Sequence, residues 1–235
     1  MWKVGVILIF LFIQATLPFR IFSNPFRSTL HRLDKITMSS SNNPGNYYIN
    51  GNMDSLSSLA SLTRNDQMIV LLCGIAGSGK STYAKKFIGN LQPEYRKKWA
   101  VSNQDALGSR QKVLSHARTA LLAKKSVIID RCNFDVEQRG HWVNLAQEYN
   151  ISTLLCLVMP NYRDSWLCAA RAEERGSSDG VHEDGVNWKG VCMQMARGFQ
   201  YPTLDEGYSG LFICNNDQDL ECFANTIKDI GERVS

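Results

Sequence analysis

The sequence predicts an α/β fold in which helices cover both faces of a parallel β-sheet. Two observations support this prediction. Strand-length apolar segments alternate with helical periods from Gln67 onward, and each of these strand segments is apolar on both faces. A strand that is apolar on both sides must be covered on both sides, which is typical of parallel sheets flanked by helices. The 235 residues suffice for one such domain and a tail.

The expected elements follow one another in a regular order from residue 68. Short apolar runs predict strands at 68–73, 99–102, 127–129, 153–159 and 211–214. Between and after them, helical patterns predict helices at 81–88, 109–125, 136–149, 163–174, 186–197 and 220–233. We therefore expect the folded body to span residues 67–235.

The first 66 residues differ in composition from this body. Residues 1–38 contain an apolar run at 4–13, which is shorter than the roughly 20 residues of a membrane-spanning helix and resembles the apolar part of a signal peptide. Two interpretations stay open: a signal or transit-like leader, or translation that begins at Met38. Residues 39–66 are rich in Ser, Asn and Gly, which predicts a disordered linker with one short helix at 53–62. We expect no stable membrane insertion of the mature domain.

Charge and cysteine usage narrow the class of protein. The net charge of +4 belongs to residues 1–38, because residues 39–235 hold 21 basic and 21 acidic groups. A protein that coats long nucleic acid usually has a basic body, so that class is not favoured. Seven cysteines without a C-x-x-C pair favour buried, reduced thiols. We expect a nuclear or cytoplasmic location if translation begins at Met38, and organelle or secretory entry if the leader is used.

A phosphate-binding loop follows the first expected strand. The segment Gly74-Ile75-Ala76-Gly77-Ser78-Gly79-Lys80-Ser81 matches G-x-x-x-x-G-K-[ST] and leads into a helix. Backbone N–H groups of such a loop surround the β-phosphate, and the helix N-terminus adds its positive end. Lys80 would reach the β- and γ-phosphates, and Ser81 would ligate Mg²⁺. The nucleotide-binding residues we expect are Gly74, Gly77, Ser78, Gly79, Lys80, Ser81 and Thr82.

The loop predicts a nucleoside triphosphate and Mg²⁺ but leaves the acceptor open. Asp105 follows the second strand and has two interpretations: a base that faces the γ-phosphate, or a cap of the helix near Gly108. Asp130 ends the third strand, where its carboxylate would contact the water molecules that surround the metal ion. Arg171 and Arg175 are four apart on one expected helix, which suits a lid that closes on phosphates, or pairing with neighbouring glutamates.

Four ordered motifs together resemble the polynucleotide 5′-hydroxyl kinases. They are S-N-Q-D-A-L-G-S-R-Q at 102–111, S-V-I-I-D-R-C-N at 126–133, A-R-A-E-E-R at 170–175 and Y-P-T-L-D-E-G-Y at 201–208. The D-R-C-N-F-D form is also similar to kinase-like domains attached to aprataxin-type repair proteins. The resemblance covers residues 67–235 and implies an adenylate-kinase-like P-loop NTPase fold with a helical lid.

The resemblance also implies roles at the matched positions. Lys80 and Ser81 would bind the phosphates of ATP and Mg²⁺, and Asp105 would be the base for the 5′-hydroxyl. Arg171 and Arg175 would stabilise the transferring phosphoryl group, so that the expected catalytic residues are Lys80, Asp105, Arg171 and Arg175. Ser81 and Asp130 would hold the metal, and the acceptor would contact Arg110, Asp130 and Asn133.

The partners implied by the resemblance are 5′ ends of DNA or RNA. The sequence departs from the family's pattern at two places. Ala106 stands where the family usually has Thr. The lid segment 176–190 contains Asp179, Glu183 and Asp184, which is more negative charge than a lid over nucleic acid should carry. Two alternatives therefore stay open. One is a kinase of a small hydroxylated metabolite, and the other is a nucleotide-binding module with little turnover.

Overall fold

The computed structural model describes residues 67–179 and 185–232, and its side chains are described except for those of residues 176–184 and 230–235. The expected leader at 1–38 and the expected linker at 39–66 lie outside these residues. Of the acidic lid residues, Glu183 and Asp184 lie outside them too, as does the side chain of Asp179.

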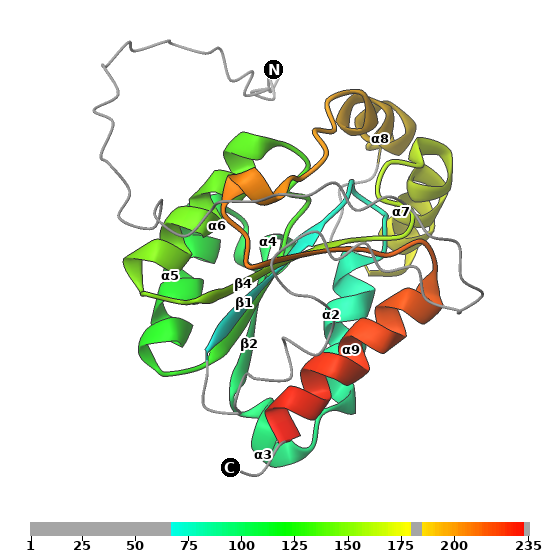
Figure 1. Ribbon diagram of the computed structural model, residues 1–235. Helices are drawn as coiled ribbons and strands as arrows, with labels where there is room; N and C mark the ends of the chain where they lie inside the picture. Colours follow the sequence, from blue (N-terminus) through cyan, green and yellow to red (C-terminus); the bar gives the residue numbers. More distant parts are fainter. Residues whose placement is uncertain (1–66, 180–184, 233–235) are drawn as a thin grey trace, which may run out of the picture. The chain divides into compact units, whose positions relative to one another are not determined.

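A parallel sheet forms the centre of the described part, in the strand order β2-β3-β1-β4-β5 (Figure 1). The strands are β1 (Met68–Cys73), β2 (Trp99–Asn103), β3 (Ser126–Asp130), β4 (Thr153–Val158) and β5 (Gly210–Ile213). All neighbouring strands pair in parallel, with Leu71 of β1 opposite Ile129 of β3 and Cys156 of β4. The predicted α/β fold class is therefore confirmed.

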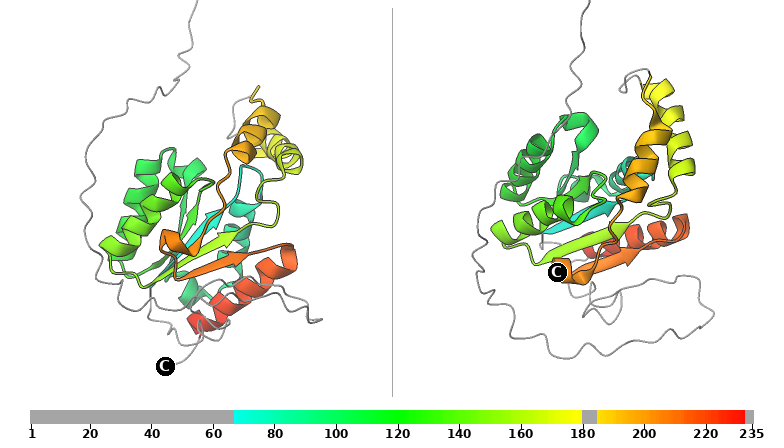
Figure 2. Two further views of the ribbon diagram at one scale, coloured as in Figure 1. Left: turned by 45° about the horizontal axis from the view of Figure 1, so that its top comes forward. Right: turned by 90° about the horizontal axis from the view of Figure 1, so that it is seen from above.

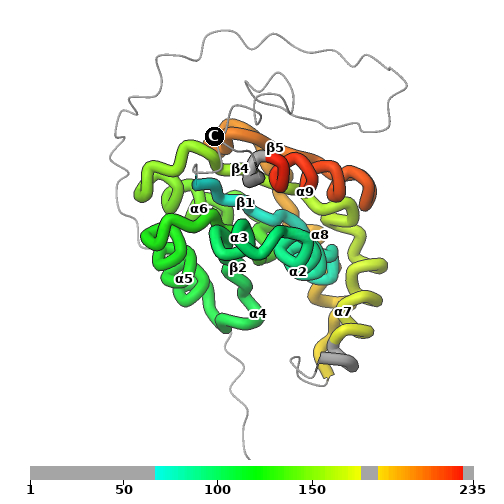
Figure 3. The backbone as a smooth tube through the Cα atoms, turned by 90° about the horizontal axis from the view of Figure 1, so that it is seen from below, coloured from blue at the N-terminus to red at the C-terminus, as the bar shows by residue number. Residues whose placement is uncertain are grey.

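Helices lie on both faces of this sheet (Figure 2). They are α2 (Lys80–Asn90), α3 (Pro93–Arg96), α4 (Gln104–Leu107), α5 (Arg110–Leu122), α6 (Val136–Glu148), α7 (Ser165–Asp179), α8 (Trp188–Arg197), the short 3₁₀ helix η2 (Leu204–Glu206) and α9 (Asp217–Glu232). Helices α5 and α6 cover one face, whereas α2 and α9 cover the other (Figure 3). Helices α7 and α8 pack against each other beyond the carboxyl ends of the strands (Figure 1).

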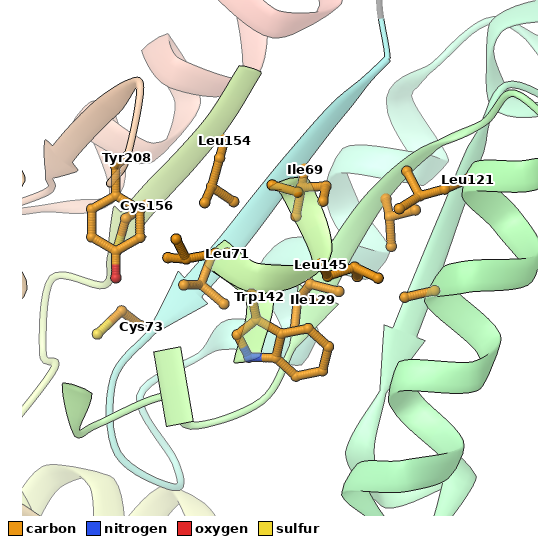
Figure 4. Packing of buried hydrophobic residues seen from close by; sticks show 14 of the residues in the cluster. Ile69, Leu71, Cys73, Leu121, Ile129, Trp142, Leu145, Leu154, Cys156 and Tyr208 are labelled. Carbon is orange, nitrogen blue, oxygen red and sulfur yellow. The ribbon is translucent and has the colours of Figure 1, made fainter. Parts of the chain in front are cut away.

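The alternation of side chains along the strands produces two apolar cores. In β1, Ile69, Leu71 and Cys73 face α5 and α6, whereas Met68, Val70 and Leu72 face α2 and α9. Figure 4 shows the first core, in which the strand residues meet Leu121 of α5 and the ring of Trp142 of α6. Because β1 is fully buried between two neighbours, its carboxyl end and the loop after it are held firmly.

The predicted strands and longer helices all occur, with ends that differ by a few residues. The structure adds α3, α4 and η2, which the sequence did not predict. Each contains four residues or fewer, too few to show a helical period. Within the described residues, no helix combines the length and the apolar character that crossing a membrane requires. The seven cysteines are free thiols, and five of them are buried.

Candidate active site

The loop at 74–81 connects β1 to α2 in the strand–loop–helix order that a phosphate-binding loop needs. Its backbone is fixed from two sides, because Gly74 N donates to Cys132 O at 2.9 Å and Ile75 N donates to Tyr162 O at 2.9 Å. At Gly77 φ is +77°, and a Cβ there would lie 1.9 Å from the carbonyl oxygen of Cys168 on α7. Only glycine fits this position, because the backbone of the loop lies in direct contact with the backbone of α7.

Lys80, at the first position of α2, lies inside the loop. Its side chain is buried, and Nζ donates to Ile75 O at 2.7 Å and to Ser78 Oγ at 3.2 Å. The ammonium is therefore held at the concave side of the loop together with the positive N-terminal end of α2. Such an arrangement of cation, backbone and helix terminus is suited to bind phosphate.

A cavity of about 970 Å³ opens above this loop. Its wall includes every residue from Gly77 to Thr82, so all of the expected nucleotide-binding residues except Gly74 line it. The expected Asp105, Asp130, Arg171 and Arg175 line it as well. The volume is at the upper end of the range for single small-molecule sites, roughly 300–1,000 Å³, which leaves space for a second molecule beside a nucleotide.

Asn103 joins two of the expected metal-binding groups. Its Nδ2 donates to Asp130 Oδ2 at 2.5 Å and lies 3.5 Å from Ser81 Oγ, while its Oδ1 accepts from Ala106 N at 2.7 Å and caps α4. The hydroxyl of Ser81 and the buried carboxylate of Asp130 thus surround the same amide. One carboxylate and one hydroxyl suit Mg²⁺, which takes its other ligands from water and phosphate. The described part of the chain has no group of three or more His, Cys, Asp or Glu side chains that would hold a metal by themselves.

Asp105 does not cap a helix. It lies in the first turn of α4, where Asn103 is the cap, while Ser109 caps α5 by accepting from Lys112 N. The cap interpretation of Asp105 is therefore wrong. Its carboxylate lines the cavity instead, and its Oδ2 approaches Nη2 of Arg175 at 4.0 Å. By contrast, Asp135 is the N-cap of α6, because its Oδ1 accepts from Gln138 N at 2.7 Å.

Basic side chains from different elements line the cavity, together with acidic ones. Arg171 and Arg175 reach it from α7, Lys80 from α2 and Arg131 from the loop after β3. Burial lowers the pKa of Arg131, and the charge of nearby Arg110 lowers it further. Among the described residues, Nε and Nη1 of Arg131 have no hydrogen-bond partner although both atoms are buried. An anion in this part of the cavity would therefore be bound favourably.

Arg110 itself is exposed on the first turn of α5 and is absent from the cavity lining of the described part. Its contact with an acceptor phosphate stays a prediction. It lies close enough to Arg131 and His141 for its charge to lower both of their pKa values, after burial as the larger cause.

The structure corrects the expectation for Asn133. Its side chain is fully buried, with Nδ2 donating to Leu72 O at 2.8 Å and Oδ1 accepting from Trp142 Nε1 at 2.8 Å. Its φ is +49°, a left-handed conformation in which Asn is more frequent than most residues. Because the polar atoms are occupied inside the protein, Asn133 cannot contact an acceptor. It fixes the loop that follows Asp130 and contains Arg131.

The motif at 201–208 stabilises the same loop from outside. Glu206 forms two hydrogen bonds with the fully buried Arg139, at 2.7 and 2.8 Å, and accepts another from Tyr208. Arg139 in turn donates to the carbonyl of Asn133 at 3.2 Å. Burial alone would raise the pKa of Glu206, but the hydrogen bonds from Arg139 and Tyr208 hold it below its usual value.

Several cavity residues were missed by the reasoning from sequence. They are Asn103, Arg131, Phe134, Gln138, Trp188 and Met195. Asn103 and Arg131 stand next to or near recognised carboxylates at strand ends, and that position is the signal that identifies them. Trp188 and Met195 belong to α8, whose placement over the loop depends on long-range packing and has no local signal.

The fold and the loop define the class of the protein: a P-loop nucleotide-binding protein with a central parallel sheet. The family model described as AAA domain matches residues 69–200. The chain belongs to this family.

Curated relatives confirm the resemblance to polynucleotide kinases. The chain is 29% identical to a bifunctional polynucleotide phosphatase/kinase of Schizosaccharomyces pombe over 65% of this chain and 36% of that protein. It is 30% identical to Transcription factor bHLH140 of Arabidopsis thaliana over 70% of this chain and 18% of that protein. The chain thus matches only a minor part of these relatives. The solved structure of Chaetomium thermophilum Kti12 with ADP-AlF₃ is 20% identical, with 70% of this chain and 100% of that chain covered and a TM-score of 0.47.

Proposed function

We propose that residues 67–235 form an ATP-dependent kinase domain that phosphorylates the 5′-hydroxyl end of DNA or RNA. The observation that carries the proposal is the position of Asp105, which lines the same cavity as the phosphate-binding loop and lies 4.0 Å from a lid arginine. A protein that only binds a nucleotide has no need for a carboxylate at this place. The name of the fission yeast relative supports a polynucleotide as the acceptor.

In this mechanism the loop and Lys80 hold the β- and γ-phosphates of ATP, as their geometry suits. Ser81 and Asp130 would hold Mg²⁺, with Asn103 positioning both groups, and the ion would neutralise phosphate charge when bound. Arg171 and Arg175 would extend from α7 toward the γ-phosphoryl group, where their charge stabilises it during transfer.

Asp105 would accept the proton of the acceptor hydroxyl. The hydroxyl oxygen forms the new bond to the γ-phosphorus, the bond between this phosphorus and the β,γ-bridging oxygen breaks, and ADP leaves. The guanidinium of Arg175 lies 4.0 Å from Oδ2 of the Asp105 carboxylate, so the proposed base and the arginine proposed to stabilise the phosphoryl group lie side by side. Positioning and charge neutralisation supply most of the acceleration in reactions of this kind.

The proposed substrates place the protein where ATP and nucleic-acid ends occur, in the nucleus, the cytoplasm or an organelle. End repair and RNA processing are the reactions that need such a kinase, because ligation requires a 5′-phosphate.

The experiment that tests this function uses the full chain with γ-labelled ATP and Mg²⁺. The acceptors are 5′-hydroxyl DNA, 5′-hydroxyl RNA and a set of small hydroxylated metabolites. We expect label on the oligonucleotides, lost in Lys80→Ala and kept in Lys85→Ala, which removes an exposed lysine of the same helix outside the cavity. Label on a small metabolite alone would indicate that the protein is instead a kinase of a small hydroxylated metabolite. Nucleotide binding without label on any acceptor would show the binding module.

A further inference from the structure

The cavity extends to both sides of the phosphate-binding loop. The loop follows β1, the middle strand. On one side of it, Asp105 follows β2, Asp130 ends β3 and Phe134 follows β3. On the other side, Asp217 and Leu220 of α9 follow β5 and also line the cavity. The half that contains Asp105 and Asp130 is the half in which an acceptor would lie.

The wall of this acceptor half beyond Asp130 contains a group of apolar side chains, two of them aromatic. Three apolar side chains line it, Phe134, Trp188 and Met195, each half-buried, alongside the polar Arg131 and Gln138. Trp188 and Met195 are two turns apart on α8, so they share one face of that helix, and both pack against the buried cluster that contains Ile75 of the loop and Cys168 of α7. We call these three residues the aromatic wall.

Phe134 is joined to the segment after α8 by its backbone. Its carbonyl accepts from Gln200 N at 2.8 Å, and its ring lies near Gly198, where a Cβ would be 3.4 Å from Cε2. The loop after β3 and the segment that follows α8 therefore lie together at the ring of Phe134. Arg131, with two buried guanidinium nitrogens that have no hydrogen-bond partner in the described residues, lies between Asp130 and this ring in the sequence.

We infer that the aromatic wall binds the base of the acceptor's terminal nucleotide. The inference rests on the proposed function and adds a property by which the enzyme selects its acceptor. The terminal nucleotide of the acceptor must carry a base. A base has an apolar π-face that can stack on Phe134, whereas a sugar without a base would leave the wall exposed to water. The guanidinium of Arg131 is suited to the phosphate next to such a nucleotide.

The test compares two 5′-hydroxyl oligonucleotides that differ only at the first residue. One carries a normal nucleotide there, and the other carries a tetrahydrofuran residue, which has the 5′-hydroxyl and the phosphate but no base. We expect the unmodified full chain to phosphorylate the base-bearing end with a kcat/KM about tenfold higher, because the base stacks on an aromatic ring.

The variant Phe134→Leu keeps an apolar side chain but loses the ring. We expect the ratio of the two kcat/KM values to fall toward one, with the abasic end phosphorylated as before. Tyr201→Leu is the matched control, because Tyr201 is an exposed aromatic residue outside the cavity lining, and its ratio should stay that of the unmodified chain. Since each ratio is measured within one protein sample, partial unfolding of a variant does not change it.

Equal phosphorylation of both ends by the unmodified chain would overturn the inference and leave the kinase function standing. An unchanged ratio in Phe134→Leu would also overturn it, because the ring would then contact no part of the acceptor's base. A higher KM for ATP as the main effect of Phe134→Leu would overturn it too, because the ring would then contact ATP. Absence of label on both ends would refute the proposed function itself, and the aromatic wall as an acceptor site with it.

Discussion

The Asp105 carboxylate and the Arg175 guanidinium approach each other to 4.0 Å, although one residue lies on the short helix α4 and the other on α7. Their side chains are 47% and 33% exposed, so the pair contributes little to the free energy of unfolding, about 0–1 kcal/mol. The position of this pair in the cavity is therefore more important for the reaction than for the fold.

We predict that Arg175→Ala lowers kcat by about a thousandfold, because an arginine that stabilises the transferring phosphoryl group has an effect of this order. The melting temperature should change by no more than a few degrees. Arg197→Ala, which removes an exposed arginine of α8 outside the cavity lining, is the control and should have normal kcat. A normal kcat in Arg175→Ala would show that the lid arginine takes no part in transfer.

The glycine at position 77 allows a second prediction. In Gly77→Ala the new Cβ would meet the Cys168 carbonyl at 1.9 Å, at a φ of +77°, so the loop and α7 must move apart. We expect a loss of several degrees in melting temperature and no further stabilisation by added ATP. Thermal unfolding with and without nucleotide measures both.

Gly89→Ala is the matched control for this change. A Cβ at Gly89 in α2 meets nothing within 4 Å, so this variant should be more stable, by about 0.5–1 kcal/mol, and should bind nucleotide normally. If Gly77→Ala and Gly89→Ala gave the same melting temperature, the close approach of loop and helix would be refuted.

The buried pair of Arg139 and Glu206 gives a prediction about stability and pH. Glu206→Gln leaves the buried guanidinium without its counter-charge, which costs about 3–5 kcal/mol at pH 7. Because the pKa of Glu206 is lower in the folded than in the unfolded state, its contribution is fully present above the unfolded value of about 4.3. It is lost as the pH falls through the lower, folded value.

Urea unfolding of both proteins between pH 7 and pH 3 measures this difference. The unmodified chain should lose its advantage over Glu206→Gln only below about pH 4.3. An advantage that is already small at pH 7 would mean that the ion pair does not hold the loop of Asn133.

The sequence alone was sufficient to predict the parts of this protein that depend on local patterns. The buried runs of β1, β3 and β4 and the spacing of the phosphate-binding loop are such patterns, and each occurs where it was expected. Asn133 shows where prediction from the sequence fails. An Asn after a strand-end Asp has the same appearance in a sequence whether it faces solvent or, as here, donates to Leu72 O and accepts from Trp142.

Phe134 shows a second limit. Nothing near it in the sequence indicates that α8 will lie against the loop after β3, since that contact joins segments far apart in the chain. The same applies to the pairing of Asp105 with Arg175, which depends on how α7 is placed over the sheet.

Salt provides a further prediction. Residues 39–235 carry equal numbers of basic and acidic groups, so the binding of an oligonucleotide should depend on a few local contacts with phosphate. We expect the logarithm of the affinity to fall only modestly with the logarithm of the salt concentration. A slope equivalent to about six or more phosphate contacts would contradict this view of the surface.

The central claim is that Asp105 accepts the proton of the acceptor, and single-turnover phosphoryl transfer tests it most directly. The rate is measured with a 5′-hydroxyl oligonucleotide and saturating ATP for the unmodified chain, Asp105→Asn and the control Asp205→Asn, whose carboxylate is exposed on η2. We predict that Asp105→Asn transfers about 10²–10⁴ times more slowly with unchanged nucleotide affinity, and that Asp205→Asn is normal. Transfer by Asp105→Asn at the rate of the unmodified chain would contradict the claim.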